Sequence, residues 1–306
     1  MRNRTPMLLI LLLAASWHGC RGNPQHLPAG PLRVAVSIIP QEWLVREIGG
    51  QYVDVVAMVK PGESHETYQP TDAQISRVMG GAAYFCIGMP FENGRAFANI
   101  RSQGKLRMVD VREGIELREI RPAESPGGEE ASKDDARHKH RHEHGGKDPH
   151  VWLSPKLLKI QARTVAKTLG ELDPAHREAY DRNLAALGAK LDAADGEIHR
   201  LLDPLRGKTF FVFHPAWGYF ADEYGLKQVA IEQEGKEPSD EEATALQRSA
   251  REQGAKVVFV QPQIASRGAE AVAHAIGARV EPLDPLAPDV LDNLVRAARA
   301  IAASFQ

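Results

Sequence analysis

Short apolar runs alternate with longer amphipathic segments along the chain from Leu32 onward. The first apolar runs are LRVAVSI, YVDVVAMV, AAYFCIG and LRMVDV, and segments such as PQEWLVREIGG and TDAQISRVMGG lie between them with helical patterns. Strands that alternate with helices at this spacing are typical of βαβ units and a parallel sheet. The pattern therefore predicts a first α/β lobe whose regular part ends near residue 120.

Residues 173–203 predict one long helix. Asp173 suits the N-cap and Pro174 the first helical position. Apolar residues then follow a helical period up to Pro204, at Tyr180, Leu184, Leu187, Leu191, Ile198 and Leu201. About thirty residues at a rise of 1.5 Å give a helix of roughly 45 Å. Such a helix is long enough to join two lobes as a stiff connection.

The α/β alternation returns after this helix, with the apolar runs KTFFVFH, KQVAIEQ, KVVFVQP and RVEPLDPL. Ser239 and Glu242 have the spacing of a capping box at the start of one of the intervening helices. The predicted fold is two α/β lobes with mainly parallel sheets, at residues 30–172 and 204–306, joined by the rigid helix at 173–203. Because ligands of open α/β sheets bind beyond the strand ends, we expect the functional site in the cleft between the lobes.

Residues 121–147 interrupt the first lobe. This stretch has no aliphatic residue larger than Ala and is dense in charged residues, Gly and Pro, so we expect a disordered surface loop. Four of its histidines alternate with charged residues, at His138, His140, His142 and His144. Such tracts bind metal ions, so we interpret them as an accessory metal-binding loop, with a polar spacer as the alternative.

The N-terminus reads MRNRTPMLLILLLAASWHGC, with two arginines, a short apolar run and then small and polar residues. This layout is typical of an export signal, so we assign residues 1–20 to a signal peptide and expect a periplasmic or extracytoplasmic protein. Cys20 is a candidate lipidation site that would anchor the mature chain to the membrane. Ordinary signal cleavage beside an incidental cysteine is the alternative.

The composition is that of a globular protein, with 43% hydrophobic and 25% charged residues and a formal net charge of -2. No basic stripe interleaved with aromatic residues occurs, which argues against nucleic acid as a partner. The nearly neutral net charge favours a small molecule or an ion as the ligand. We also expect the protein to be a monomer.

Four short stretches place candidate metal ligands at or near predicted strand ends. They are PGESHETYQP with His65 and Glu66, DPHVWLSP with His150, FVFHPAWGYF with His214, and EPLDPL with Asp284. Each residue alone has an ordinary structural explanation, such as a helix cap or a turn. Ligands so far apart in the chain can complete one tetrahedral site only if both lobes contribute to it.

Together these stretches resemble the zinc and manganese solute-binding proteins of bacterial ABC transporters, and the zinc-binding ZnuA-like branch in particular. The resemblance rests on PGESHETYQPT, IGMPFE, the His-rich insertion, DPHVWLSP, FHPAWGYF, GKEPSDEE and EPLDPLAP, which occur in the family order. It implies two lobes bridged by a long helix, and a protein that captures Zn²⁺ and delivers it to a membrane permease.

The resemblance also implies a ligand set. His150 and His214 would ligate the metal, one from each lobe, and Asp284 would supply or face the remaining position. An ungapped alignment puts Glu66 at the family's histidine position and His65 at its proline position. The preserved spacing of the residues that follow favours Glu66, whereas a shift of the loop by one residue would bring His65 to the metal.

Three alternatives remain. A manganese-binding member of the same family is the first, although the histidine tract favours zinc over the harder manganese ion. The second is an adhesin with a structural metal. The third is a metallohydrolase, which would need an open coordination position and a general base, and the chain has no HExxH motif.

Overall fold

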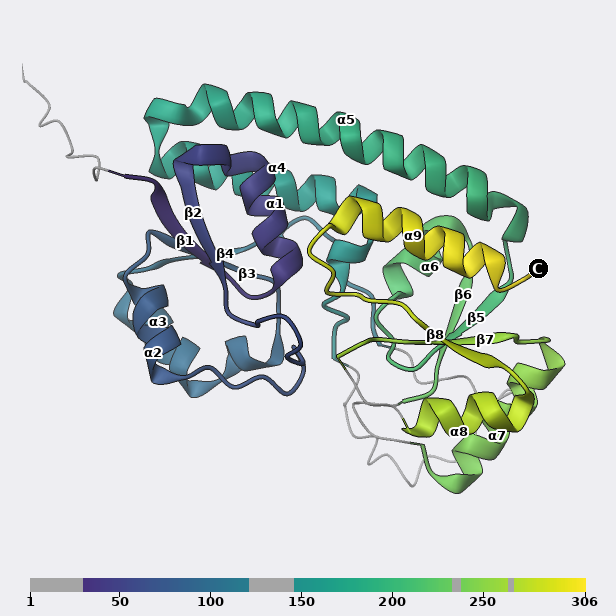
Figure 1. Cartoon of the computed structure of the whole chain (residues 1–306). Helices are drawn as coiled ribbons and strands as arrows, with labels where there is room; N and C mark the ends of the chain where they lie inside the picture. Colours follow the sequence, from purple (N-terminus) through teal and green to yellow (C-terminus); the bar gives the residue numbers. More distant parts are fainter. Residues whose placement is uncertain (1–29, 121–145, 233–237, 264–266) are drawn as a thin grey trace, which may run out of the picture.

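The structure is a computed structural model that describes residues 30–120, 146–232, 238–263 and 267–306 (Figure 1). The predicted signal peptide with Cys20 and the alternating histidines His138, His140, His142 and His144 lie outside these residues, so they stay predictions. Within the described part of the chain, no helix is both long enough and apolar enough to cross a membrane.

The first lobe is built on a four-stranded parallel sheet with the order β2-β1-β3-β4. Its strands are β1 (Leu32–Val36), β2 (Val53–Ala57), β3 (Ala83–Cys86) and β4 (Arg107–Asp110). Its helices are α1 (Ile39–Gly49), α2 (Asp72–Met79) and α3 (Arg95–Gln103), with short 3-10 turns at Gly50–Tyr52 and Pro90–Asn93. Figure 1 shows α1 on the side of the sheet toward α5, with α2 and α3 on the other side.

The second lobe repeats this design, with a parallel sheet of order β6-β5-β7-β8. Its strands are β5 (Thr209–Val212), β6 (Lys227–Ala230), β7 (Val257–Val260) and β8 (Arg279–Pro282). Its helices are α6 (Gly218–Tyr224), α7 (Asp240–Glu252), α8 (Arg267–Ile276) and α9 (Val290–Ala303). The predicted two-lobed α/β fold is confirmed.

Two details of the second lobe bear on the predictions. The capping box at the start of α7 is present, since the Ser239 side chain accepts a hydrogen bond from Glu242 N and Glu242 reaches back to Ser239 N. Helix α9 was not predicted from the sequence. Its apolar residues Val290, Leu294 and Ile301 nevertheless recur at helical spacing and are buried, so the pattern was present in the sequence.

The helices α4 (Pro155–Leu172) and α5 (Arg177–Leu202) lie side by side and join the two lobes (Figure 1). The α-helix begins at Arg177 and not at Pro174, because Pro174–His176 forms a 3-10 turn. Asp173 does not cap this turn with its side chain. Its Oδ2 instead accepts hydrogen bonds from His176 Nδ1, at 2.6 Å, and from Tyr180 OH, at 2.7 Å.

Helix α5 packs against α1 and α4 of the first half of the chain and against α6 and α9 of the second. Its buried positions include Leu187, Leu191 and Ile198. They belong to one apolar cluster that continues from the first sheet through α4 and α5 to β5 and α9. A smaller cluster, which includes Phe211 and Val258, lies between the second sheet and helices α7 and α8. The two lobes therefore share most of their core.

We predict that Leu191→Ala lowers the free energy of unfolding by about 2–5 kcal/mol, because Leu191 is fully buried in the shared cluster. Urea unfolding followed by circular dichroism measures this. Arg182→Ala on the exposed side of α5 is the control, and we expect it to stay within about 0.5 kcal/mol of the wild type. Equal effects of the two substitutions would contradict the shared core.

Candidate metal centre

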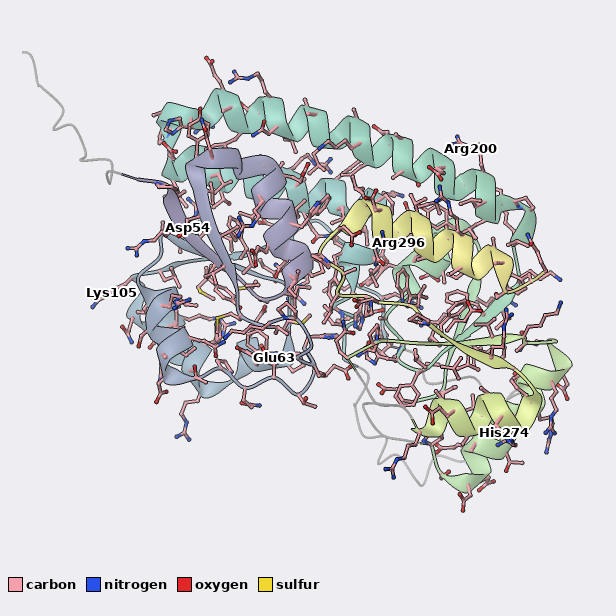
Figure 2. All side chains as sticks on the ribbon, in the orientation of Figure 1. Asp54, Glu63, Lys105, Arg200, His274 and Arg296 are labelled. Carbon is pink, nitrogen blue, oxygen red and sulfur yellow. The ribbon has the colours of Figure 1, made fainter. Side chains whose placement is uncertain are left out.

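The site lies between the lobes, where irregular segments follow strand ends. His65 and Glu66 lie in the loop between β2 and α2, and His214 is the second residue after β5. His150 immediately precedes a 3-10 turn, Val151–Leu153, that leads into α4. The loop that carries His65 is marked by Glu63 in Figure 2, on the side of the first lobe toward the second. The loops after β2 and β5 and the segment before α4 thus bring these side chains from both lobes toward one point.

Three imidazole rings meet at this point. His150 Nε2 lies 3.2 Å from His65 Nε2 and 3.2 Å from His214 Nε2. The three side chains can each offer one nitrogen within 4.8 Å of the others, and all three residues are buried. Their side chains come from distant parts of the chain and share a space with little solvent.

Glu66 reaches the same cluster from the position next to His65. Its Oε1 lies 3.2 Å from His214 Nε2, and 27% of its side chain is exposed. The two candidates for the first ligand are therefore not exclusive, because adjacent residues of an irregular loop both face the cluster. His65 forms the buried part and Glu66 the more open side.

Two buried carboxylates contact the Nδ1 atoms of two of the histidines, on the side of each ring away from the cluster. His150 Nδ1 lies 2.7 Å from Asp148 Oδ1, and His214 Nδ1 lies 2.7 Å from Glu232 Oε1. When a ring is neutral, its Nδ1–H donates to the carboxylate and its Nε2 lone pair faces the cluster. His65 Nδ1 is buried and has no hydrogen-bond partner among the described residues. Two of the three rings are thus fixed in the tautomer that binds metal.

The surroundings shift the pKa values of His65 and His214 in opposite directions. Burial and the neighbouring His150 and His214 rings lower the pKa of His65 well below its ordinary value. Burial also acts to lower the pKa of His214, but its hydrogen bond to Glu232 and the charge of Glu66 outweigh burial and raise that pKa. Burial raises the pKa of Glu66 as well. A proton that enters the cluster is therefore expected on His214 before His65.

Asp284 is not brought into this cluster. Among the described residues, the groups able to hold one ion comprise the three histidines, or Glu66 with His214 and Glu232. The Asp284 carboxylate accepts hydrogen bonds from Gln263 Nε2, in the segment after β7, and from Leu286 N in its own loop, both at 2.8 Å. Glu66 supplies the carboxylate that faces His214 Nε2 in this structure.

Asp148 and Glu232 were missed from the sequence. Asp148 lies in the same DPHVWLSP stretch as His150, where a carboxylate two residues before a candidate ligand could have suggested an orienting partner. Glu232 closely follows β6, the strand beside the one that ends before His214, so its place became apparent only once the strand order was known.

A short strap, defined as residues 118–120 and 146–148, fixes Asp148. Glu119 and Lys147 form an antiparallel bridge, and Asp148 N donates to Arg118 O at 2.9 Å. Tyr219 of α6 accepts a hydrogen bond from Arg118 N and donates one to Asp148 O. The strap is therefore attached to the second lobe beside the cluster.

The Arg118 side chain adds to this attachment. Its guanidinium lies 3.6 Å from Asp148 Oδ2 and 3.3 Å from Asp222 Oδ2 of α6. A methyl group at Gly218 would lie 1.1 Å from the Arg118 Nη1 atom. The small residue at the start of α6 thus makes room for the cation that supports Asp148.

Three neutral imidazole nitrogens and one carboxylate form a donor set that suits zinc, which is usually four-coordinate and takes nitrogen and oxygen ligands in proteins. The same set is poorer for manganese, which prefers oxygen donors. Because the rings come from both lobes, a bound ion would link the lobes directly.

Comparison with known families identifies the family of the chain. The family model described as zinc-uptake complex component A, periplasmic, matches residues 34–304. The chain belongs to this family. The description of the family is that of a periplasmic component of a zinc-uptake complex, which is a binding class of protein.

Individual relatives and a solved structure are also similar to this chain. The chain is 37% identical to the high-affinity zinc uptake system protein ZnuA of Brucella abortus over 161 residues, which span 50% of this chain and only 48% of that relative. The Bacillus subtilis protein of the same name is 28% identical over 90% of this chain and 85% of its own length. A crystal structure of ZnuA superimposes with a TM-score of 0.79 at 37% identity, covering 90% of this chain and 100% of that chain.

We predict that the metal-free histidines protonate in a fixed order. A raised pKa means that His214 protonation stabilises the fold below the ordinary histidine pKa, and that this contribution is lost as pH rises through the raised value. For His65 the lowered pKa has the opposite sign, so acid destabilises the fold through this residue.

Ring-nitrogen NMR of the apoprotein tests this order, with signals assigned through His65→Gln and His214→Gln. At about pH 6 we expect the His214 ring to be protonated and the His65 ring to be neutral. Protonation of His65 before His214 would contradict the arrangement.

We predict that Asp148→Asn weakens zinc binding by about 10–100-fold, because the amide no longer fixes the His150 tautomer. Competition against a chelator of known zinc affinity measures the change. Asp222→Asn is the matched control, since Asp222 contacts the other side of Arg118 and its side chain is 64% exposed. If both variants bind zinc like the wild type, Asp148 does not orient His150 for the metal.

Proposed function

We propose that this protein captures Zn²⁺ outside the cytoplasm and delivers it to the membrane permease of an ABC transporter. The observation that carries the proposal is the convergence of three buried Nε2 atoms from separate loops between the lobes. Membership of the zinc-uptake family supports it, as do the names of the Brucella and Bacillus relatives.

The proposed ligands are His65, His150 and His214, with Glu66 completing the coordination. Asp284 is proposed to stay outside the resting coordination, because its Oδ1 already accepts two hydrogen bonds. This set has three nitrogen donors, which favours zinc over manganese. Four protein ligands would also leave no open position for a reacting water, so we propose a binding role and not catalysis.

The remaining predictions extend this proposal. Alternating histidines at His138, His140, His142 and His144 would hold further zinc weakly near the site. Cys20 would carry a lipid that keeps the exported protein at the membrane. We propose that the protein acts as a monomer, because a single chain supplies every donor of the cluster.

Zinc titration tests the ligand set. We expect His150→Ala to weaken zinc binding by more than the roughly 100-fold that loss of an orienting partner can cause, because His150 lies between the other two rings. His274→Ala is the control, since His274 is exposed on α8, remote from the cluster (Figure 2). Equal affinity of His150→Ala and wild type would disprove the site.

The same titration separates the two neighbours in the β2–α2 loop. His65→Gln is expected to lose more affinity than Glu66→Gln, because the His65 side chain is fully buried beside His150 and Glu66 is partly exposed. Asp284→Asn should bind zinc like the wild type. A large loss in Asp284→Asn would restore Asp284 as a ligand and remove Glu66 from that position.

A further inference from the structure

The hydroxyl group of Tyr219 is inserted into the strap. Arg118 and Asp148 lie opposite each other, next to the antiparallel bridge of the strap, and Asp148 N donates to Arg118 O at 2.9 Å. In a regular antiparallel pair, Arg118 N would donate back to Asp148 O. The Tyr219 hydroxyl takes the place of this second bond, because it accepts from Arg118 N at 3.1 Å and donates to Asp148 O at 2.9 Å. One side-chain oxygen from the second lobe therefore joins the two sides of the strap.

The residue to which this hydroxyl donates also orients a candidate ligand. Asp148 Oδ1 accepts a hydrogen bond from His150 N at 3.0 Å and lies 2.7 Å from His150 Nδ1. Asp148 and His150 are both buried. The hydroxyl of Tyr219 holds the backbone carbonyl of Asp148, and the orienting carboxylate extends from the same residue. A shift of the Asp148 backbone would therefore move the carboxylate and, with it, the His150 ring.

Tyr219 belongs to the segment that carries another candidate ligand. It lies in the first turn of α6, shortly after His214, and the residues between the two are buried. Ala216 N donates to His214 O at 2.8 Å. Trp217 N donates to Gln228 Oε1 of β6 at 2.7 Å. The Tyr219 hydroxyl is thus placed at a fixed position relative to His214, and it transmits that position to the strap.

The other contacts between α6 and the strap do not need the hydroxyl. The guanidinium carbon of Arg118 lies 5.7 Å from the centroid of the Tyr219 ring, as in a cation–π contact. The ion pair of Arg118 with Asp222 is weakened by solvent, because the Asp222 side chain is 64% exposed. The substitution Tyr219→Phe keeps the ring and its packing and removes only the two hydrogen bonds. It therefore isolates the contribution of the hydroxyl.

We propose that Tyr219 is a positioning residue for zinc, because its hydroxyl sets the distance between His150 and His214 through the strap. The inference rests on the proposed function, since it takes zinc as the ion. Without the hydroxyl, Arg118 N and Asp148 O can form the direct hydrogen bond of a regular pair. This closure keeps the strap intact but draws Asp148 away from the position in which His150 Nε2 lies 3.2 Å from His214 Nε2. Zinc affinity then falls while the stability of the fold changes little.

Competition for zinc against a chelator of known affinity tests the proposal. We expect Tyr219→Phe to bind zinc about tenfold more weakly than the wild type, as for the loss of a group that orients a metal ligand from outside. Tyr224→Phe is the matched control, because it removes another buried tyrosine hydroxyl of α6, which donates to Asp195 Oδ1 of α5 at 2.8 Å. It should bind zinc like the wild type, and both variants should unfold in urea close to the wild-type midpoint. Equal zinc affinity of the two variants overturns the proposal.

A double-mutant cycle with Asp148→Asn distinguishes positioning from a general structural role. If the hydroxyl acts through the Asp148 carboxylate, its loss has little effect once that carboxylate is gone. Tyr219→Phe should then weaken zinc binding by less than about twofold in the Asp148→Asn protein. A further loss of about tenfold in the double variant would mean that the two residues act independently, and it would overturn the proposal.

Ring-nitrogen NMR of the metal-free protein at a fixed pH provides a readout that does not depend on zinc. In Tyr219→Phe the signal of His150 Nδ1, which faces Asp148, should shift, and that of His214 Nδ1, which faces Glu232, should stay as in the wild type. An unchanged His150 signal overturns the proposal and leaves the proposed function standing. Failure of the wild type to bind zinc overturns the proposed function and this inference together.

Discussion

Three imidazole rings share one buried space between the lobes, and the close approach of their nitrogens limits how much charge that space can hold. His150 Nε2 lies 3.2 Å from both other rings, so protonating all three would place like charges together away from water. The carboxylates of Asp148 and Glu232 hold two of the rings with their lone pairs inward. A dication can then replace protons as the charge that brings the rings together. The metal-binding role proposed for this cluster depends on this constraint.

The fold supplies the frame that keeps the rings close. His214 follows a central strand of its sheet, and His65 lies in the loop after β2 of the other sheet. Helices α4 and α5 hold the two sheets through a continuous apolar cluster. Trp152 reinforces the junction, because its Nε1 donates to Pro285 O across the lobes, and its ring lies 5.1 Å from that of His150. A large opening of the lobes would expose this shared core, so smaller movements of the loops are favoured energetically.

Much of this arrangement could be predicted from the sequence, for identifiable reasons. Alternating strand and helix patterns determine parallel sheets, and local signals such as Ser239 with Glu242 are read directly from spacing. The choice between His65 and Glu66 could not be settled that way, because an irregular loop has no period that assigns its side chains to one side. Glu232 became visible only through the order of the strands, and Asp284 accepts a hydrogen bond from Gln263 of the segment after β7, a pairing between residues distant in sequence.

Glu119 and Lys147 are paired in an antiparallel bridge, so the chain between them begins and ends at the same place in the structure. A segment that starts and ends at one paired position can change in length or composition without pulling on Asp148 or His150. The entropy of closing such a loop grows only slowly, by about 0.6 kcal/mol for each doubling of length. The strap thus isolates the candidate metal site from changes made in the chain beyond it, and it makes this junction a suitable place to graft a peptide tag or a reporter domain.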